Sequence, residues 1–159
     1  MKNLLLGLLF CPLFLFGQNV ENVDISTYKI GLNLETITVL NADSCFNSVL
    51  SILKHQGLDF DRIDKENGII TTRARVMKNN DGTSYALKVY FEKYDIQIRV
   101  FVTGDVSLTY DQITGTKWYQ AQNKNGKDIQ SNGFKYMVYW ATTIGNAVNG
   151  KVVLSEEKG

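Results

Sequence analysis

Apolar and polar residues alternate with a period of two along the stretch Ile69–Thr103. One set of alternate positions is mainly apolar and consists of Ile70, Ala74, Val76, Tyr85, Leu87, Val89, Phe91, Ile96, Ile98, Val100 and Val102. The other set is mainly polar and consists of Thr71, Arg73, Arg75, Lys88, Tyr90, Glu92, Gln97, Arg99 and Phe101. Because successive side chains of a strand point to opposite faces, this pattern predicts a sheet with one buried and one solvent-facing surface. The turn residues Lys78–Gly82 interrupt the pattern.

The residues before this stretch predict a strand, a helix and a hairpin. Tyr28–Leu40 alternates, but the apolar residues change parity near Glu35-Thr36, which predicts a bulge or two short strands. Capping residues at Asn41–Ser44 precede apolar residues at helical spacing, and Gly57 is the expected end of this helix. A short strand through Leu58, Phe60 and Ile63 then meets the hairpin signal Lys65-Glu66-Asn67-Gly68.

The residues after Thr103 give a weaker signal. Val106–Tyr110 predicts a further short strand, which either extends the preceding strand or folds back on it. Asp111–Asn132 is rich in polar residues and glycine and predicts mostly loop. Gly133–Val148 is amphipathic at helical spacing and stops at Asn149-Gly150, so we expect a closing helix followed by a tail, Lys151–Gly159.

This order, β-α-β-β-β-β-α, predicts an α+β fold: one antiparallel sheet with two helices packed on one face. We expect a single domain over residues 28–150, preceded by a lead-in at 18–27. With the hairpin residues Lys65-Glu66-Asn67-Gly68-Ile69-Ile70, the element order resembles the TATA-binding-protein-like, helix-grip arrangement found in small secreted bacterial domains of unknown function. That resemblance covers roughly Tyr28 to Thr103 and implies a fold but no activity.

The N-terminus predicts export. Lys2 is followed by an apolar run, Leu4–Phe16, and by the small residue Gly17, which together are typical of a secretory signal peptide, residues 1–17. An uncleaved anchor and a lipoprotein signal built on Cys11 are the alternatives. We expect a periplasmic or secreted protein without a membrane span after cleavage.

Charge and cysteine content narrow the function classes. Removal of residues 1–17 from the chain of 159 would leave 142 residues with 16 basic and 16 acidic side chains, because only Lys2 is lost from the 17 basic residues. A neutral exported domain has no electrostatic footprint for nucleic acid, so we expect no nucleic-acid partner. Cys45 would be the one remaining cysteine and could form no internal disulfide.

Two groups of residues are candidate binding sites. Cations and aromatic rings interleave on the predicted wet face at Arg73, Arg75, Lys88, Tyr90, Arg99 and Phe101. Such a surface could bind an anionic or sugar-like group, although the same residue types are ordinary on an exposed sheet face. Trp118, Tyr136 and Trp140 form either the rim of a ligand pocket or the rim of the core.

Catalytic and metal chemistry have no specific signal. His55 is the sole histidine, Cys45 lies among apolar residues, and the acidic residues Asp59, Asp61, Asp64 and Glu66 lack the pattern of a calcium loop. We therefore expect no metal, no cofactor and no enzyme activity. The leading hypothesis is a non-catalytic domain that binds a partner protein or an envelope component through the outer sheet face. A small apolar-ligand carrier, with a pocket between the sheet and the C-terminal helix, is the alternative.

Overall fold

The computed structural model describes residues 33–77, 83–109, 116–122 and 129–155. Within these ranges the elements are β1 (Asn33–Thr38), α1 (Ala42–His55), β2 (Phe60–Asp64), β3 (Ile69–Thr72), β4 (Arg75–Val76), β5 (Thr83–Tyr94), β6 (Gln97–Thr109), β7 (Thr116–Gln120), α2 (Ile129–Ala147) and β8 (Lys151–Ser155). The predicted signal peptide and lead-in lie outside the described residues, as does the turn Lys78–Gly82.

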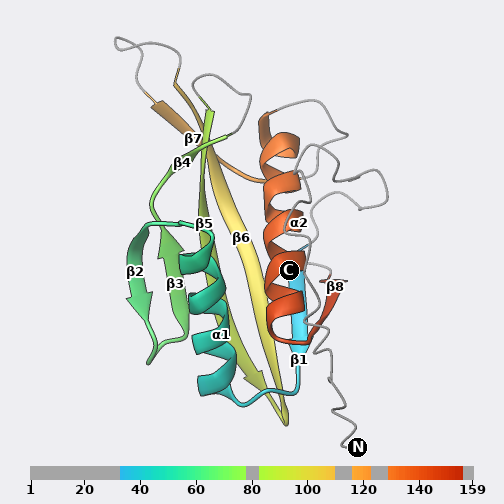
Figure 1. The fold of residues 1–159 in the computed structure, drawn as a ribbon. Helices are drawn as coiled ribbons and strands as arrows, with labels where there is room; N and C mark the ends of the chain where they lie inside the picture. The colour runs from blue at the N-terminus through green and yellow to red at the C-terminus, as the bar shows by residue number, and fades with distance from the viewer. Residues whose placement is uncertain (1–32, 78–82, 110–115, 123–128, 156–159) are drawn as a thin grey trace, which may run out of the picture.

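A long hairpin of β5 and β6 forms the centre of one antiparallel sheet (Figure 1). The strand order is β2-β3-β5-β6-β1-β8, with β4 also paired to β5 and β7 also paired to β6. The β5–β6 ladder runs from Thr83 opposite Leu108 to Tyr94 opposite Gln97. Asp95 and Ile96 form the two-residue turn between the strands, with Asp95 at a φ of 55°. This hairpin sets the direction and register of its neighbours on both sides.

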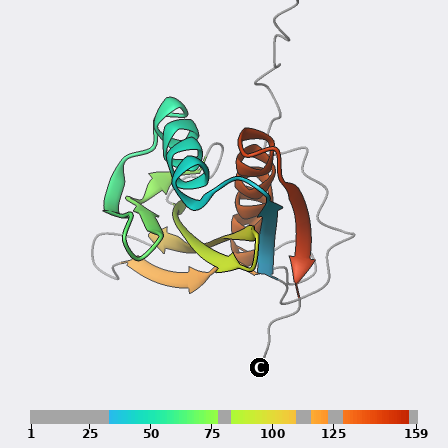
Figure 2. The same cartoon turned by 90° about the horizontal axis from the view of Figure 1, so that it is seen from below.

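Both helices pack on the same face of the sheet (Figure 2). The fold class predicted from the sequence, α+β with one antiparallel sheet and helices on one face, is therefore confirmed. Helix α2 lies over β6 and β1, and α1 lies beside it toward β5 (Figure 1). We call the sheet surface that faces away from both helices the outer face.

Alternation in β5 and β6 is confirmed where the strands are regular. Tyr85, Leu87, Val89, Ile98, Val100 and Val102 are buried under the helices, together with Ile70 of β3. Gly104 continues this set on β6, where the backbone approaches α2 so closely that an added Cβ would lie 2.5 Å from Sδ of Met137. Only glycine leaves room for that contact.

The alternation fails at three positions that the sequence placed on the buried face. Val76 is 68% exposed and Ala74 is also exposed, whereas Met77 is buried. Arg73 and Ala74 interrupt the strand between β3 and β4, so the parity set by β3 does not continue into β4. Ile96 is 79% exposed because it lies in the β5–β6 turn rather than in a strand.

The predicted bulge or break near Glu35-Thr36 is wrong. Strand β1 pairs in continuous register with β6 on one side and with β8 on the other. Thr36 and Thr38 point to the helices, and the Thr38 hydroxyl donates to the Val148 carbonyl oxygen at 2.8 Å. Ile37 therefore lies on the outer face, and the change of parity reflects threonines in the core rather than irregular backbone.

Local signals predicted the remaining elements with unequal success. Asn41 caps α1 by accepting a hydrogen bond from the Ser44 N–H at 2.8 Å, and the β2–β3 hairpin forms with Gly68 at a φ of 61°. The predicted strand Val106–Tyr110 is the continuation of β6 as far as Thr109. Strand β7 and the start of α2 at Ile129 fall in the predicted loop, and β8 occupies the predicted tail. Strands β7 and β8 are short and pair with β6 and β1, so their structure comes from neighbours that are distant in the sequence.

Candidate binding surface

The outer face of β5 and β6 brings four of the six predicted surface residues together. Tyr90 on β5 lies directly opposite Phe101 on β6, and Lys88 and Arg99 lie on either side of this pair, Lys88 opposite Thr103 and Arg99 opposite Glu92. Lys88 is exposed, whereas the other three side chains are partly buried. Neither helix covers this face (Figure 2), so its chemistry is set by cross-strand neighbours.

Tyr90 and Phe101 stack on each other. Their ring centroids lie 4.8 Å apart and the ring planes differ by 9°. Because 4.8 Å equals the spacing of neighbouring strands, each ring stands upright on its strand and presents a face to the other ring. Ile69 lies opposite Tyr90 on β3, and Glu35 lies opposite Phe101 on β1. We call Ile69, Tyr90, Phe101 and Glu35 the aromatic row.

Arg99 is fixed by two contacts on the same face. Its Nε atom lies 3.2 Å from Oε1 of Glu35, whose side chain is only 4% exposed. Its guanidinium carbon lies 4.2 Å from the centroid of the Tyr94 ring. The ion pair is close but not aligned as a hydrogen bond. The charge of Arg99 is thus engaged within the sheet, and Lys88 is the more available cation for a partner.

Arg73 and Arg75 are separate from these four residues. Arg73 is exposed in the irregular segment between β3 and β4. Arg75 on β4 lies opposite Tyr85, a position on the helix-covered side, and its Nη1 donates to the Gln56 carbonyl oxygen at the end of α1 at 3.1 Å. The change of parity after Thr72 explains this placement, since a regular strand would have kept Arg75 on the outer face.

The structure describes the side chains of two of the three residues predicted to form a pocket rim. The Tyr136 ring packs against Tyr85 in a tilted arrangement with centroids 4.6 Å apart, and Trp140 is buried against Tyr139 in an edge-on contact. Burial raises the pKa of Tyr85 above its ordinary value. Trp118 pairs with Ser107 in the β6–β7 ladder, but its side chain lies outside the described residues. Tyr136 and Trp140 thus belong to the contact between α2 and the sheet.

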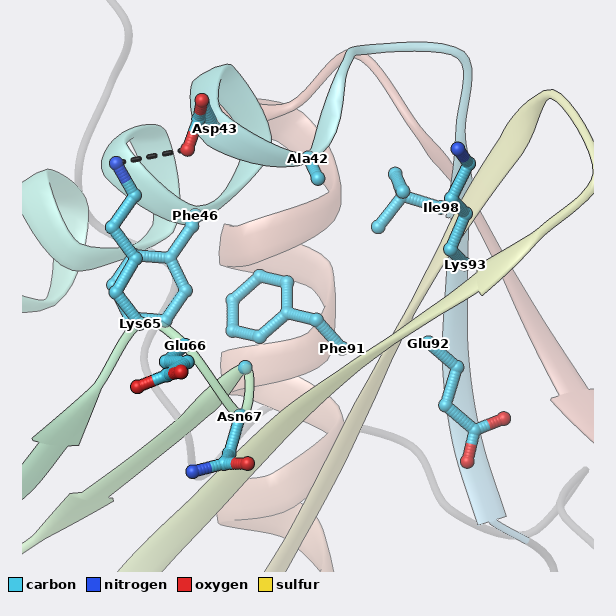
Figure 3. Close-up of a pocket in the computed structure, with 11 residues that line it drawn as sticks. Ala42, Asp43, Phe46, Lys65, Glu66, Asn67, Phe91, Glu92, Lys93 and Ile98 are labelled. Atoms are coloured by element: carbon cyan, nitrogen blue, oxygen red, sulfur yellow. Dashed lines mark ion pairs between the residues drawn. The ribbon is translucent and has the colours of Figure 1, made fainter.

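A pocket that no sequence pattern predicted lies at the start of α1. This pocket has a volume of about 190 Å³ and lies between the first turn of α1, the β2–β3 turn and the end of the β5–β6 hairpin. Its residues are Ala42, Asp43, Phe46, Lys65, Glu66, Asn67, Gly68, Phe91, Glu92, Lys93 and Ile98. Phe91 and Ile98 point into it from the sheet, while the Glu92 carboxylate points away (Figure 3). Only the tertiary fold brings these segments together, so no local pattern could predict the pocket.

An ion pair lies at the edge of this pocket. Nζ of Lys65, from the β2–β3 turn, lies 2.9 Å from Oδ1 of Asp43 in α1, and both side chains are more than half exposed (Figure 3). The rings of Phe46 and Phe91 meet on the inner side, with centroids 5.0 Å apart. The pocket therefore has an apolar interior and a rim with charges of both signs.

Cys45 and the possible metal ligands are the remaining candidates for chemistry. Cys45 is fully buried, and burial raises the pKa of its thiol to about 11. Among the described residues, no group of three or more histidine, cysteine, aspartate and glutamate side chains is placed to hold a metal ion. No helix in the described part of the chain is long and apolar enough to cross a membrane.

Comparisons with known proteins identify no relative from which a function could be transferred. No protein-family model matches the chain, and no curated protein is significantly similar to it.

Proposed function

We propose that the protein is a non-catalytic exported domain that binds a partner protein or an envelope component through its outer sheet face. The observation that carries this proposal is the grouping of Lys88, Tyr90, Arg99 and Phe101 on a face that neither helix covers. Preformed aromatic and cationic side chains on a rigid sheet lose little conformational freedom on binding, which favours recognition.

The geometry of the aromatic row favours a protein partner over a sugar. Tyr90 and Phe101 use one face of each ring against each other, so a flat platform for stacking a sugar ring is missing at this pair. Their edges, together with Ile69 and the aliphatic stem of Lys88, suit an apolar contact surrounded by polar groups. An acidic group on the partner would face Lys88.

The alternative of an apolar-ligand carrier has less support. The proposed pocket would lie between the sheet and α2, where the helix and strands approach closely. A Cβ added at Gly133 would lie 2.6 Å from the Val106 side chain, and one at Gly104 would meet Met137. Side chains of the protein occupy the contact at these positions.

Charge reversal at Lys88 tests the proposal. The protein is purified from an exporting host, and Lys88→Glu and Thr103→Glu are compared with Lys54→Glu in capture of envelope proteins. Lys88 and Thr103 lie opposite each other on the outer face, whereas Lys54 is exposed on α1. We expect a partner retained by the parent and the Lys54 variant to be lost by both outer-face variants, with unchanged thermal unfolding.

Equal capture by all variants would contradict the proposal. Native mass spectrometry of the exported protein separates the alternative, because a co-purifying lipid or other apolar molecule would indicate the carrier instead.

A further inference from the structure

Three Asn-Gly dipeptides lie in the part of the chain that the structure describes. They are Asn67-Gly68 in the β2–β3 turn, Asn132-Gly133 in α2 and Asn149-Gly150 between α2 and β8. In such a dipeptide the backbone nitrogen of glycine can attack the side-chain amide carbon of asparagine, because glycine has no Cβ to obstruct the approach. The three pairs share this chemistry, so their surroundings decide which of them reacts.

The fold holds Asn132 and Asn149 away from this reaction. Ring closure requires rotation about the bond between Cα and the carbonyl carbon of asparagine, and the regular hydrogen bonds of α2 prevent that rotation at Asn132. Its neighbour Gly133 is also buried. After Asn149, the Gly150 N–H donates to the Gly145 carbonyl oxygen at 2.8 Å, and a Cβ added at Gly150 would lie 2.6 Å from a β1 side chain. Both sites therefore need the structure to open before they can react.

Asn67 has a more open setting. Its side chain is exposed in the β2–β3 turn, at one edge of the sheet, where β2 pairs on one side only among the described strands (Figure 1). The N–H of Gly68, which carries the attacking nitrogen, donates to the Lys65 carbonyl oxygen at 3.3 Å, compared with 2.8 Å at Gly150. The attacking nitrogen is thus held less firmly after Asn67 than after Asn149.

Asp64 is the residue that restrains the Asn67 side chain. Its carboxylate accepts from the Asn67 backbone N–H at 3.0 Å and from Asn67 Nδ2 at 2.9 Å. Nδ2 is the atom that leaves in the reaction, so its bond to Asp64 must break before the product can form. The strength of this contact therefore determines how often Asn67 reaches a reactive geometry.

We propose that Asn67 is a site of spontaneous deamidation in the folded protein and that Asp64 limits its rate. The Gly68 nitrogen gives up its proton and bonds to Cγ of Asn67, the Cγ–Nδ2 bond breaks, and Nδ2 leaves as ammonia. Water then opens the succinimide ring. Cleavage at Cγ leaves aspartate, whereas cleavage at the backbone carbonyl carbon leaves isoaspartate. Water is consumed and ammonia is released, so no other reactant is needed.

Either product should weaken the β2–β3 hairpin. A carboxylate at position 67 replaces the amide that donates to Asp64 and brings two negative charges together. Isoaspartate also carries the main chain through Cγ, which lengthens a turn that sets Asp64 opposite Ile69. Ile69 begins the aromatic row, so the modification would also change one end of the outer face.

Peptide mapping by mass spectrometry, on exported protein aged at mildly alkaline pH, tests the site. We expect conversion at Asn67, read as the mass gain of an amide-to-acid change, to be about a hundredfold faster than at Asn149, which must await local opening. In urea the two sites should react at similar rates, because the fold no longer distinguishes them. Equal rates at both sites in the folded parent, or no conversion at Asn67, would overturn the proposal.

Variants of Asp64 test the restraint. Asp64→Ala should raise the rate at Asn67 about tenfold, because both hydrogen bonds to the carboxylate are lost. Asp64→Asn, which keeps an acceptor oxygen, should give an intermediate rate. Asp61→Ala removes an exposed carboxylate of the same strand and leaves both Asp64 bonds in place, so its rate should match the parent.

Asn149 serves as an internal reference in every variant. Unfolding would speed conversion at Asn149 as well as at Asn67, whereas loss of the Asp64 contact should speed conversion at Asn67 alone. An unchanged rate at Asn67 in both Asp64 variants, or equal acceleration at the two sites, would overturn the role of Asp64. None of these measurements involves a binding partner, so failure here is distinguishable from failure of the proposed function.

Discussion

Nε of Arg99 lies 3.2 Å from Oε1 of Glu35 on the sheet face that carries neither helix. The Glu35 side chain is 4% exposed, whereas that of Arg99 is 30% exposed. A nearly buried carboxylate thus depends on a cation that can itself still reach water. The two residues should therefore tolerate substitution unequally.

Arg99→Met should destabilise the protein more than Glu35→Gln does. The first change leaves Glu35 buried without its counterion, which we expect to cost about 2 kcal/mol after allowing for the partial exposure of the pair. The second leaves Arg99 free to turn toward solvent and should cost about 1 kcal/mol or less. Urea unfolding at neutral pH measures both, and an equal or reversed order would contradict the role assigned to the pair.

Thr38→Val should cost more stability than Thr36→Val. Thr38 Oγ1 donates to the Val148 carbonyl oxygen at 2.8 Å and accepts from the Leu40 N–H at 3.2 Å. Its loss leaves two backbone groups without this partner, at a cost of about 1–3 kcal/mol. The Thr36 hydroxyl lies 3.4 Å from the Ala141 carbonyl oxygen, a weaker contact, so its replacement should cost less than about 1 kcal/mol. Unfolding of the two variants side by side supplies the comparison.

These two threonines also explain where prediction from the sequence succeeded and failed. Regular alternation in β5 and β6 was sufficient to orient the central hairpin, since each strand is long and buried on one face. In β1, Thr36 and Thr38 occupy core positions and Glu35 is buried on the outer face. Polar residues that are satisfied by tertiary contacts mimic solvent-facing residues, so the pattern predicted irregular backbone where there is none.

The candidate site was predictable only as far as the strands were regular. Lys88, Tyr90, Arg99 and Phe101 share the outer face because the β5–β6 ladder is continuous. Arg75 does not, because the break between β3 and β4 changes parity at residues that no local signal distinguishes. The resemblance to the helix-grip arrangement stays a prediction, as does export.

Gly104→Ala should destabilise the contact between β6 and α2. The added Cβ would lie 2.5 Å from both Sδ of Met137 and the Ala86 carbonyl oxygen, and the resulting displacement should cost about 1–3 kcal/mol. In the Met137→Ala background the same substitution should cost less, because the side-chain clash is removed while the backbone contact persists. A double-mutant cycle by urea unfolding gives the coupling. Independent, additive effects would contradict the close approach.

The Cys45 thiol should be unreactive in the folded protein. Burial raises its pKa from 9.0 to about 11, so the folded state keeps the thiol neutral at pH values where the unfolded chain ionises it. Stability from this group is full below pH 9 and is lost as the pH rises toward 11. We expect a thiol reagent at pH 8 to label Cys45 at the rate of protein opening, and urea to accelerate labelling. Rapid labelling of the native state would contradict this burial.

Asp64 should make the β2–β3 hairpin sensitive to acid. Its carboxylate accepts hydrogen bonds from the Asn67 backbone N–H at 3.0 Å and from Asn67 Nδ2 at 2.9 Å, and it pairs with Arg62. These contacts lower its pKa from 3.8 to about 2, the Asn67 backbone bond contributing most. The ionised form is therefore favoured in the folded state. Its contribution to the free energy of unfolding is full above pH 4, declines between pH 4 and pH 2, and is absent below pH 2. The stability difference between the parent and Asp64→Asn should shrink over that interval in urea unfolding. A difference between parent and Asp64→Asn that stays constant from pH 5 to pH 2 would show that the turn does not depend on the charge of Asp64.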